Sequence, residues 1–124
     1  MGSLIRFVGR VFLGSSFVIL GWQAAQEPGG RVNAAAALGL PEPELMVRLN
    51  GWAMVAGGIA LALGILQRLS ALVLIGALAP TTFAGHPFWQ ETDPQKRHGQ
   101  EIHFLKNLSM IGGLILVLAR PKSQ

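Results

Sequence analysis

The segment LNGWAMVAGGIALALGILQRLSALVLIGALAPTTFAG, residues 49–85, decides the fold. The run 49–66 and the run 69–85 contain no charged side chain, and only Gln67 and Arg68 separate them. At about 1.5 Å per residue each run forms a helix roughly 25 Å long, close to the ~30 Å thickness of the hydrocarbon core of a bilayer. Two such runs joined by so short a link predict an antiparallel pair of transmembrane helices.

Two further apolar runs complete the pattern. They are LIRFVGRVFLGSSFVILGW, residues 4–22, and IHFLKNLSMIGGLILVLA, residues 102–119. The first run, with its basic start, also resembles a signal peptide. Arg6 and Arg10 lie four residues apart, however, so both can reach lipid head groups from one helical face, which favours a retained helix. We predict an all-α fold, a four-helix transmembrane bundle forming one domain over residues 1–124, with spans near 4–22, 49–66, 69–85 and 102–119.

The composition agrees with lipid as the surrounding medium. Apolar residues make up 51% of the chain and charged residues only 13%, whereas soluble domains carry charge on roughly a quarter of their residues. The net charge of +4 does not indicate a nucleic-acid partner, because the ten Lys and Arg residues fall singly between apolar runs. With no cysteine in the chain, disulfides, thiolate catalysis and cysteine-ligated clusters are excluded.

The charge distribution predicts the topology. An even number of spans puts both termini on one side of the membrane, and that side holds Arg6, Arg10, Arg68, Arg120 and Lys122. The opposite side holds the other five basic residues together with all six acids. The five basic residues on each side of the membrane give no bias, and acidic residues contribute little to topology. We expect the side with the net positive charge, which holds both termini, to be the cytoplasmic side.

The first connection, residues 23–44, is long enough to hold an element of its own. Its segment VNAAAALG, residues 32–39, contains helix formers, with Asn33 as a candidate cap and Gly39 as a candidate stop. We predict a short interfacial or re-entrant helix here, and a loop without regular structure is the alternative.

Small residues recur at helical spacing in three of the runs. In lipid, helices associate through close backbone packing, which small residues permit. The pattern therefore predicts either tight packing within the bundle or a face for a homo-oligomer, and it does not separate the two. The sets are Gly14 with Gly21; Ala53 with Gly57; Ala56, Ala60 and Gly64; and Ser109 with Gly113.

Three segments resemble the DoxX family of small four-helix integral membrane proteins. They are GWAMVAGGIALALGILQRLSALVL, PTTFAGHPFW and HFLKNLSMIGGLILV, and the resemblance covers nearly the whole chain, from GRVFLG to GGLILV. The form PTT-x-x-GHPFW looks most like the actinobacterial branch. The resemblance implies a bacterial cytoplasmic membrane and membrane redox work, including quinone-linked thiosulfate oxidation and complexes with sulfurtransferase-like or superoxide-handling partners. A glutamate common early in the second helix of the family is absent, and Asn50, which cannot carry protons, is its candidate replacement.

Polar side chains gather at one predicted membrane interface. They come from the start of the second span, the end of the third and the start of the fourth, and Phe83, Phe88 and Trp89 are expected to wall the pocket. Ionisable residues in or beside spans are candidates for function. Such a pocket suits an amphiphile with a polar head and an apolar tail, such as a quinone, whose carbonyls accept hydrogen bonds. The candidate ligand-binding residues are Arg48, Asn50, Thr81, Thr82, His86, Trp89, His103, Lys106 and Asn107.

Each candidate also has a structural interpretation. Trp89 fits an aromatic belt, Arg48 and Lys106 fit snorkelling cations, and the Thr81 and Thr82 hydroxyls fit carbonyls freed by a nearby proline.

The two histidines near this interface are a poor set of ligands for a metal or haem. His86 and His103 lie at the rim, whereas haem ligands usually lie deep in a bundle, so haem is not expected. Glu101 is the one carboxylate close by in sequence, and two histidines with one acid predict no metal site.

The sequence therefore predicts an integral membrane subunit of a redox-linked complex, an accessory subunit rather than a complete enzyme, with a quinone-like ligand at one interface. The alternative is a non-catalytic anchor or assembly partner for an oxidoreductase or sulfurtransferase complex. A small-molecule carrier ranks third, because few polar residues lie within the spans to line a hydrophilic path.

Overall fold

A computed structural model describes residues 2–27, 29, 31–85 and 88–119. Every regular element in this part of the chain is helical, which confirms the predicted all-α fold. Four helices are long and apolar enough to cross a membrane, namely α1, α3, α4 and α5. The elements are α1 (Gly2–Gln26), α2 (Arg31–Ala37), α3 (Pro43–Leu63), α4 (Gln67–Gly85), the 3-10 turn η1 (Phe88–Gln90) and α5 (Pro94–Ala119).

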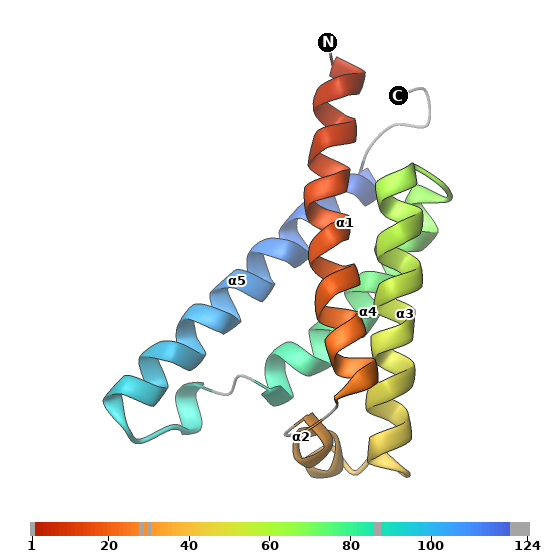
Figure 1. Ribbon diagram of the computed structural model, residues 1–124. Helices are drawn as coiled ribbons and strands as arrows, with labels where there is room; N and C mark the ends of the chain where they lie inside the picture. Colours follow the sequence, from red (N-terminus) through yellow and green to blue (C-terminus); the bar gives the residue numbers. More distant parts are fainter. Residues whose placement is uncertain (1, 28, 30, 86–87, 120–124) are drawn as a thin grey trace.

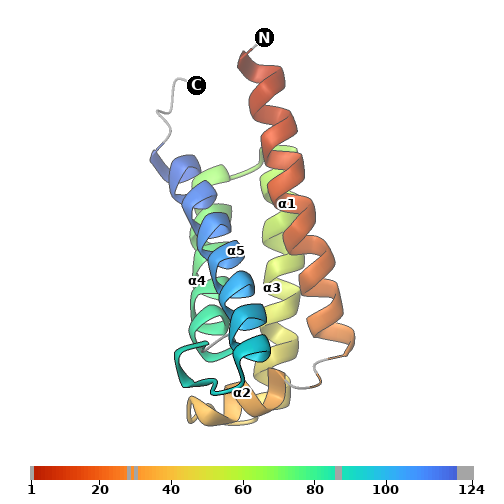
Figure 2. The same cartoon turned by 90° about the vertical axis from the view of Figure 1, so that its left-hand side faces the viewer.

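The long helices form two pairs. Figure 2 shows α1 and α3 on one side of the molecule and α4 and α5 on the other, with α2 lying across the lower end. In Figure 1, α5 leans away from α1 towards the end at which α5 begins. A contact between α1 and α5 lies at Gly113, where an added Cβ would stand 3.4 Å from the Leu13 side chain. The bundle is thus closed near the chain termini and splayed at the opposite end.

Glycines bring the backbones of α1 and α3 into contact. A Cβ built on Gly14 would lie 2.5 Å from the carbonyl oxygen of Gly58, and one built on Gly58 would lie 2.6 Å from that of Gly14. The same reciprocal contact joins Gly21 and Gly51 one heptad away. Since the helices are antiparallel, two glycines seven residues apart on each produce two matched crossing points. Gly14 and Gly21 therefore serve packing within the chain.

The core lies where the four long helices meet. Phe17, Leu61, Leu74 and Leu114, one from each helix, are fully buried. The outward side chains are equally apolar: Phe12 is 71% exposed and Leu116 is 74% exposed, for example. Side chains of this kind contact lipid in a membrane-spanning helix, and the chain is a multi-pass membrane protein.

The link between α3 and α4 differs from the prediction. Gly64 adopts a positive φ of 76°, and its N–H donates to the carbonyl oxygens of Ala60 and Leu61, which ends α3 at Leu63. Glycine takes this left-handed conformation at little cost. The link is therefore residues 64–66, and the prediction that Gln67 and Arg68 form the turn was wrong, because both belong to the first turn of α4.

Two helices begin with polar residues and are therefore longer at their N-terminal ends than the predicted spans. α3 begins at Pro43 and α5 at Pro94, since proline suits the first turn of a helix. The Asp93 carboxylate accepts a hydrogen bond from the Gln95 N–H at 3.0 Å and so caps α5. Hydropathy marks only the apolar part of a helix, which is why these turns were missed.

The short helix predicted in the first connection is present as α2. Gly39, with φ 77°, follows it, and the Leu40 N–H donates to the Ala35 carbonyl at 3.4 Å, so the predicted stop is confirmed. Asn33 lies inside the helix, because α2 begins two residues earlier at Arg31, and its predicted role as a cap was wrong.

Candidate ligand site at one membrane interface

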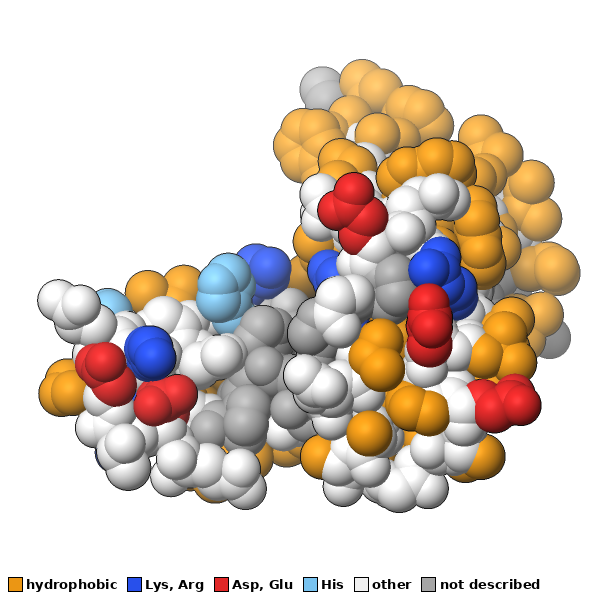
Figure 3. Space-filling view, turned by 60° about the horizontal axis from the view of Figure 1, so that its bottom comes forward, with side chains coloured by type: hydrophobic (Ala, Val, Ile, Leu, Met, Phe, Trp, Pro, Cys, Tyr) orange, Lys and Arg blue, Asp and Glu red, His pale blue; other side chains and the backbone are white. Residues whose placement is uncertain are grey.

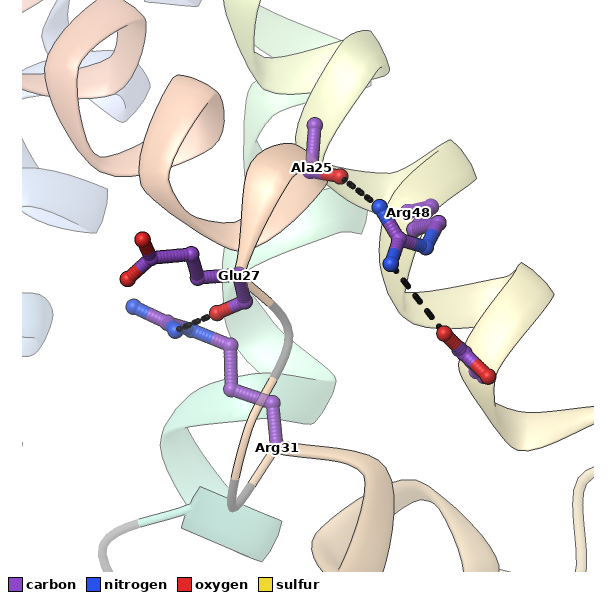
Figure 4. Close-up of polar contacts among 5 residues, drawn as sticks. Ala25, Glu27, Arg31 and Arg48 are labelled. Carbon is purple, nitrogen blue, oxygen red and sulfur yellow. Dashed lines mark hydrogen bonds and ion pairs between the residues drawn. The ribbon is translucent and has the colours of Figure 1, made fainter.

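Arg48 links the end of α1 to the start of α3 (Figure 4). Its Nη1 donates to the carbonyl oxygen of Ala25 at 2.6 Å, and its Nη2 pairs with the Glu44 carboxylate at 3.1 Å. Arg31 donates to the neighbouring carbonyl of Glu27 at 3.3 Å. The last carbonyls of a helix lack partners within it, and cations are favourable there. Arg48 is thus committed to capping α1.

Asn50 bridges α3 and α4 in the turn that precedes Pro80. Its Nδ2 donates to the carbonyl oxygen of Ala77 at 3.1 Å. Pro80 lies three residues further along α4, where it has no N–H to donate and its ring crowds the preceding turn. The amide of Asn50 therefore serves the backbone of a neighbouring helix, which is the usual use of asparagine between membrane helices.

The two threonines after Pro80 also serve the α4 backbone. The Thr81 hydroxyl donates to the Leu78 carbonyl at 2.9 Å, and the Thr82 hydroxyl donates to the same carbonyl at 2.7 Å. Thr82 is only 1% exposed. Both hydroxyls therefore bond within their own helix, but to the Leu78 carbonyl and not to that of Gly76, which is the carbonyl that Pro80 leaves without its usual donor.

Three of the candidates share one face of α5. His103, Lys106 and Asn107 are spaced by three and four residues, which places them together on a helix surface. Asn107 is 5% exposed, whereas His103 and Lys106 are exposed. Leu114, two turns beyond Asn107, is fully buried, so this face points into the bundle where the helices close. The same face is uncovered where α5 splays away.

An aromatic cluster lies on the α4 side of this face. Phe104 makes edge-to-face contacts with Phe83, Phe88 and Trp89, with ring centroids 5.5, 5.3 and 5.6 Å apart. Phe88 and Trp89 also contact each other, at 5.3 Å. The cluster thus joins the end of α4 and η1 to α5. The sequence pointed to the other three rings as walls of the site but not to Phe104, whose place beside His103 was the available signal.

The surface at this end is hollowed. In Figure 3 the lobe made by η1 and the start of α5 stands apart from the lobe made by α1 and α3. Histidine and basic side chains lie at the inner corner between the lobes, and acidic side chains lie on both lobes. The described residues therefore place potential hydrogen-bond donors at this corner.

The remaining predictions for the site are limited by the described residues. His86 lies outside them. Among the residues that are described, no three His, Asp or Glu side chains stand close enough together to hold a metal ion. Of the nine candidates, His103, Lys106 and Asn107 share one face of α5, and Trp89 contacts Phe104 of the same helix. Arg48, Asn50, Thr81 and Thr82 donate hydrogen bonds to backbone carbonyls.

Comparison with known proteins gives one match. A model of the DoxX family matches residues 5–87, which include α1, α3 and α4. The α5 face with His103, Lys106 and Asn107 lies beyond the matched residues, and the actinobacterial branch stays a prediction. No curated protein and no solved structure is significantly similar to the chain. Because the family model covers most of the chain, this four-span membrane protein belongs to the DoxX family.

Proposed function

We propose that the protein is an accessory membrane subunit of a redox-linked complex and binds a quinone-like amphiphile at the face of α5 that carries His103, Lys106 and Asn107. The observation that carries the proposal is the group formed by buried Asn107 and its exposed neighbours His103 and Lys106. Polar and ionisable groups are costly in a membrane helix and usually mark a functional site. Arg48, Asn50, Thr81 and Thr82 bond to backbone carbonyls, which explains their presence; we assign the shared face of His103, Lys106 and Asn107 to the ligand.

The chemistry of the face suits a quinone head group. The Lys106 ammonium and the Asn107 amide are donors that a quinone carbonyl oxygen can accept. The flat ring of the ligand would lie against the cluster of Phe83, Trp89 and Phe104, and its apolar tail would leave sideways into lipid. A pocket with a mostly apolar lining and a few convergent donors is the usual form of a small-molecule site.

An accessory role follows from the residue inventory. The chain has no cysteine and so no thiol for electron transfer. Electrons from a bound quinol would pass to a partner protein of the oxidoreductase or sulfurtransferase type. The anchor hypothesis has less support, because the glycine faces of α1 and α3, which could have served docking, are occupied by each other.

Both termini are placed on the cytoplasmic side of a bacterial cytoplasmic membrane in this proposal. The end that carries Arg6, Arg10 and Arg68 has no acidic residue in the described chain, which fits the side that retains positive loops. The absence of native cysteines permits a direct test. In intact cells, a membrane-impermeant maleimide should label Gln95→Cys and should spare Ser3→Cys; the reverse pattern would invert the topology.

Quinone binding is tested by titrating the full-length protein in lipid nanodiscs with menaquinone and ubiquinone analogues. We expect saturable quenching of tryptophan fluorescence. Lys106→Gln should weaken it about tenfold or more, the size of one lost charge-assisted hydrogen bond, and Asn107→Leu about fivefold, the size of one lost neutral hydrogen bond. Lys96→Gln, in the first turn of α5, is the matched control and should bind as the parent does. No saturable quenching, or equal weakening in the control, would contradict the proposal.

A further inference from the structure

α1 and α5 meet near the chain termini and diverge towards the candidate site. At the meeting point, a Cβ added to Gly113 would stand 3.4 Å from the Leu13 side chain. Towards the other end α5 leans away from α1 (Figure 1), and the lobe made by η1 and the start of α5 stands apart from α1 and α3 (Figure 3). The space between the two helices therefore widens from Gly113 to the start of α5.

The contact between Gly113 and Leu13 defines the faces that the two helices turn towards this space. Residues seven apart lie on the same side of a helix, so the face of α5 continues from Gly113 to Lys106, and that of α1 continues from Leu13 to Leu20 and Glu27. Both faces are partly covered near the contact, at Leu13, Leu20 and Gly113, and exposed further along, at Glu27 and Lys106. The two faces thus match in position, and their far ends have no cover from each other.

The far ends of the two faces carry opposite charge. Among the described residues the Glu27 carboxylate has no hydrogen bond or ion pair, although the Glu27 carbonyl accepts a hydrogen bond from Arg31. On α5, Lys106 is exposed, and His103 lies one turn nearer the helix start. If the antiparallel helices packed along their whole length, Glu27 would lie about one turn from His103 and two turns from Lys106. Opposite charges would then attract across the interface of the two helices.

Both helices that lead into the lobe have a point at which they can bend. In α5, Gly112 precedes Gly113, and a Cβ added to Gly112 would meet nothing within 4 Å, so bending there meets no neighbouring side chain. In α4, Pro80 removes one hydrogen bond of the helix. Bends in helices occur mostly at proline or at glycine and serine.

The neighbours of α4 change at Pro80. Before this proline, Asn50 of α3 donates to the Ala77 carbonyl at 3.1 Å and so holds α4 to α3. After it, Phe83 contacts Phe104 of α5, with ring centroids 5.5 Å apart. The last turn of α4 is thus attached to α5 and can move with it, while the rest of α4 stays on α3.

We infer that residues 81–85 and 88–111 form a gate that swings about Pro80 and the Gly112–Gly113 pair, from the open position in this structure onto α1, where Glu27 attracts its basic face. Hinges of this kind are a few residues that absorb the change in backbone angles. Closure covers the face of α5 that we assign to the ligand, and this part of the inference rests on the proposed function. The movement itself does not, because it follows from the contacts of the chain alone.

The test is the distance between the open ends of α1 and α5, measured by double electron–electron resonance on the full-length protein in nanodiscs. Spin labels at Gln26→Cys and Gln95→Cys, both exposed positions, report this distance without interference, because the chain has no cysteine of its own. We expect two distances in the ligand-free protein, and a larger fraction of the shorter one with a menaquinone analogue. Labels at Ser3→Cys and Ala119→Cys, at the closed end, should give a single distance.

Two substitutions should lower the short-distance fraction, and each has a matched control. Gly112→Ala favours the straight helix and should lower the fraction about fivefold, whereas Gly9→Ala, at an equally open position in α1, should have no effect. Glu27→Gln removes the attraction to α5. Glu44→Gln should have no effect on the fraction, because Glu44 pairs with Arg48 on its own helix.

A single distance at the open end, unchanged by the quinone analogue, would overturn the gate. If fluorescence quenching shows the analogue bound in the same sample, that result leaves the proposed function intact. If the analogue does not bind, the ligand-free protein decides alone: two distances support the gate and one distance overturns it. Equal fractions in Gly112→Ala and Gly9→Ala would contradict the hinge, and equal fractions in Glu27→Gln and Glu44→Gln would contradict the attraction.

Discussion

Gly21 of α1 and Gly51 of α3 face each other so closely that neither position has room for a methyl group. A Cβ on Gly21 would lie 2.5 Å from the Gly51 carbonyl oxygen, and a Cβ on Gly51 would lie 2.6 Å from that of Gly21. The tryptophans that follow them, Trp22 and Trp52, meet edge to face at 5.4 Å. Two Gly-Trp dipeptides thus pair across an antiparallel helix contact, the glycines at its centre and the tryptophans at its edge.

The first prediction concerns this contact. Gly21→Ala should lower the free energy of unfolding by about 1–3 kcal/mol, because the added methyl group meets backbone atoms that cannot move aside without separating the helices. Thermal unfolding in detergent, followed by size-exclusion chromatography, measures the loss. Gly112→Ala in α5 is the control, since its Cβ would meet nothing within 4 Å. If the two variants have equal stability, the close contact between α1 and α3 is not formed.

The second prediction concerns the cap on α1. Arg48→Ala should destabilise the protein by about 1–2 kcal/mol, because it removes a charge-assisted hydrogen bond to the Ala25 carbonyl. Glu44→Ala removes only an ion pair whose side chains are 40% and 64% exposed, and such pairs contribute at most about 1 kcal/mol. Urea or thermal unfolding of both variants compares them. A larger loss in Glu44→Ala would refute the capping role.

The third prediction separates structural from ligand-binding asparagines. Asn50→Ala should cost about 0.5–1 kcal/mol of stability, the usual value of one hydrogen bond between membrane helices, because the Ala77 carbonyl loses its donor from α3. It should leave quinone-analogue affinity unchanged, whereas Asn107→Leu should weaken affinity. Stability and binding are measured on the same nanodisc preparations. Loss of affinity in Asn50→Ala without loss of stability would assign Asn50 to the site.

The fourth prediction concerns the aromatic cluster. Phe104→Leu should expose Trp89 and shift its fluorescence, because Phe104 joins α5 to the rings of Phe83, Phe88 and Trp89. The edge-to-face contacts are worth about 0.5–1.5 kcal/mol each, so stability should fall as well. Ile115→Val, on a 52% exposed part of α5, serves as the control. An unchanged emission spectrum in Phe104→Leu would show that Phe104 does not pack against Trp89.

Much of the fold was predictable, because uncharged runs of near-constant length leave few choices in a bilayer. The faces through which the helices pack together were less predictable. The sequence showed Gly14 and Gly21 seven residues apart, but α3 carries several sets of small residues, and the faces through Ala53 and Ala56 looked as suitable as any other. Spacing does not select Gly51 and Gly58, because Ala53 with Ala60 and Gly57 with Gly64 are also seven residues apart. Only the contact with the antiparallel α1 selects them.

The sequence predicted a location for the candidate site but not which of its residues already have partners. Counting from the ends of the spans placed the polar side chains at one interface, but α3 and α5 begin at residues 43 and 94, before the predicted spans, so Asn50 and Asn107 lie further inside their helices than expected. Whether a polar side chain donates a hydrogen bond to a backbone carbonyl depends on the neighbouring helix. Asn50 reaches the carbonyl of Ala77 only because α3 and α4 lie side by side near Pro80. Such pairings are set by tertiary packing, which the positions of polar residues along one helix do not predict.

Photolabelling with an azido-quinone in nanodiscs tests the central proposal most directly. The account predicts that labelled peptides map to η1 and to residues 102–110 of α5, and that excess unlabelled quinone and Asn107→Leu each suppress the label. Label spread evenly over exposed residues of all four long helices, unaffected by competitor, would contradict it.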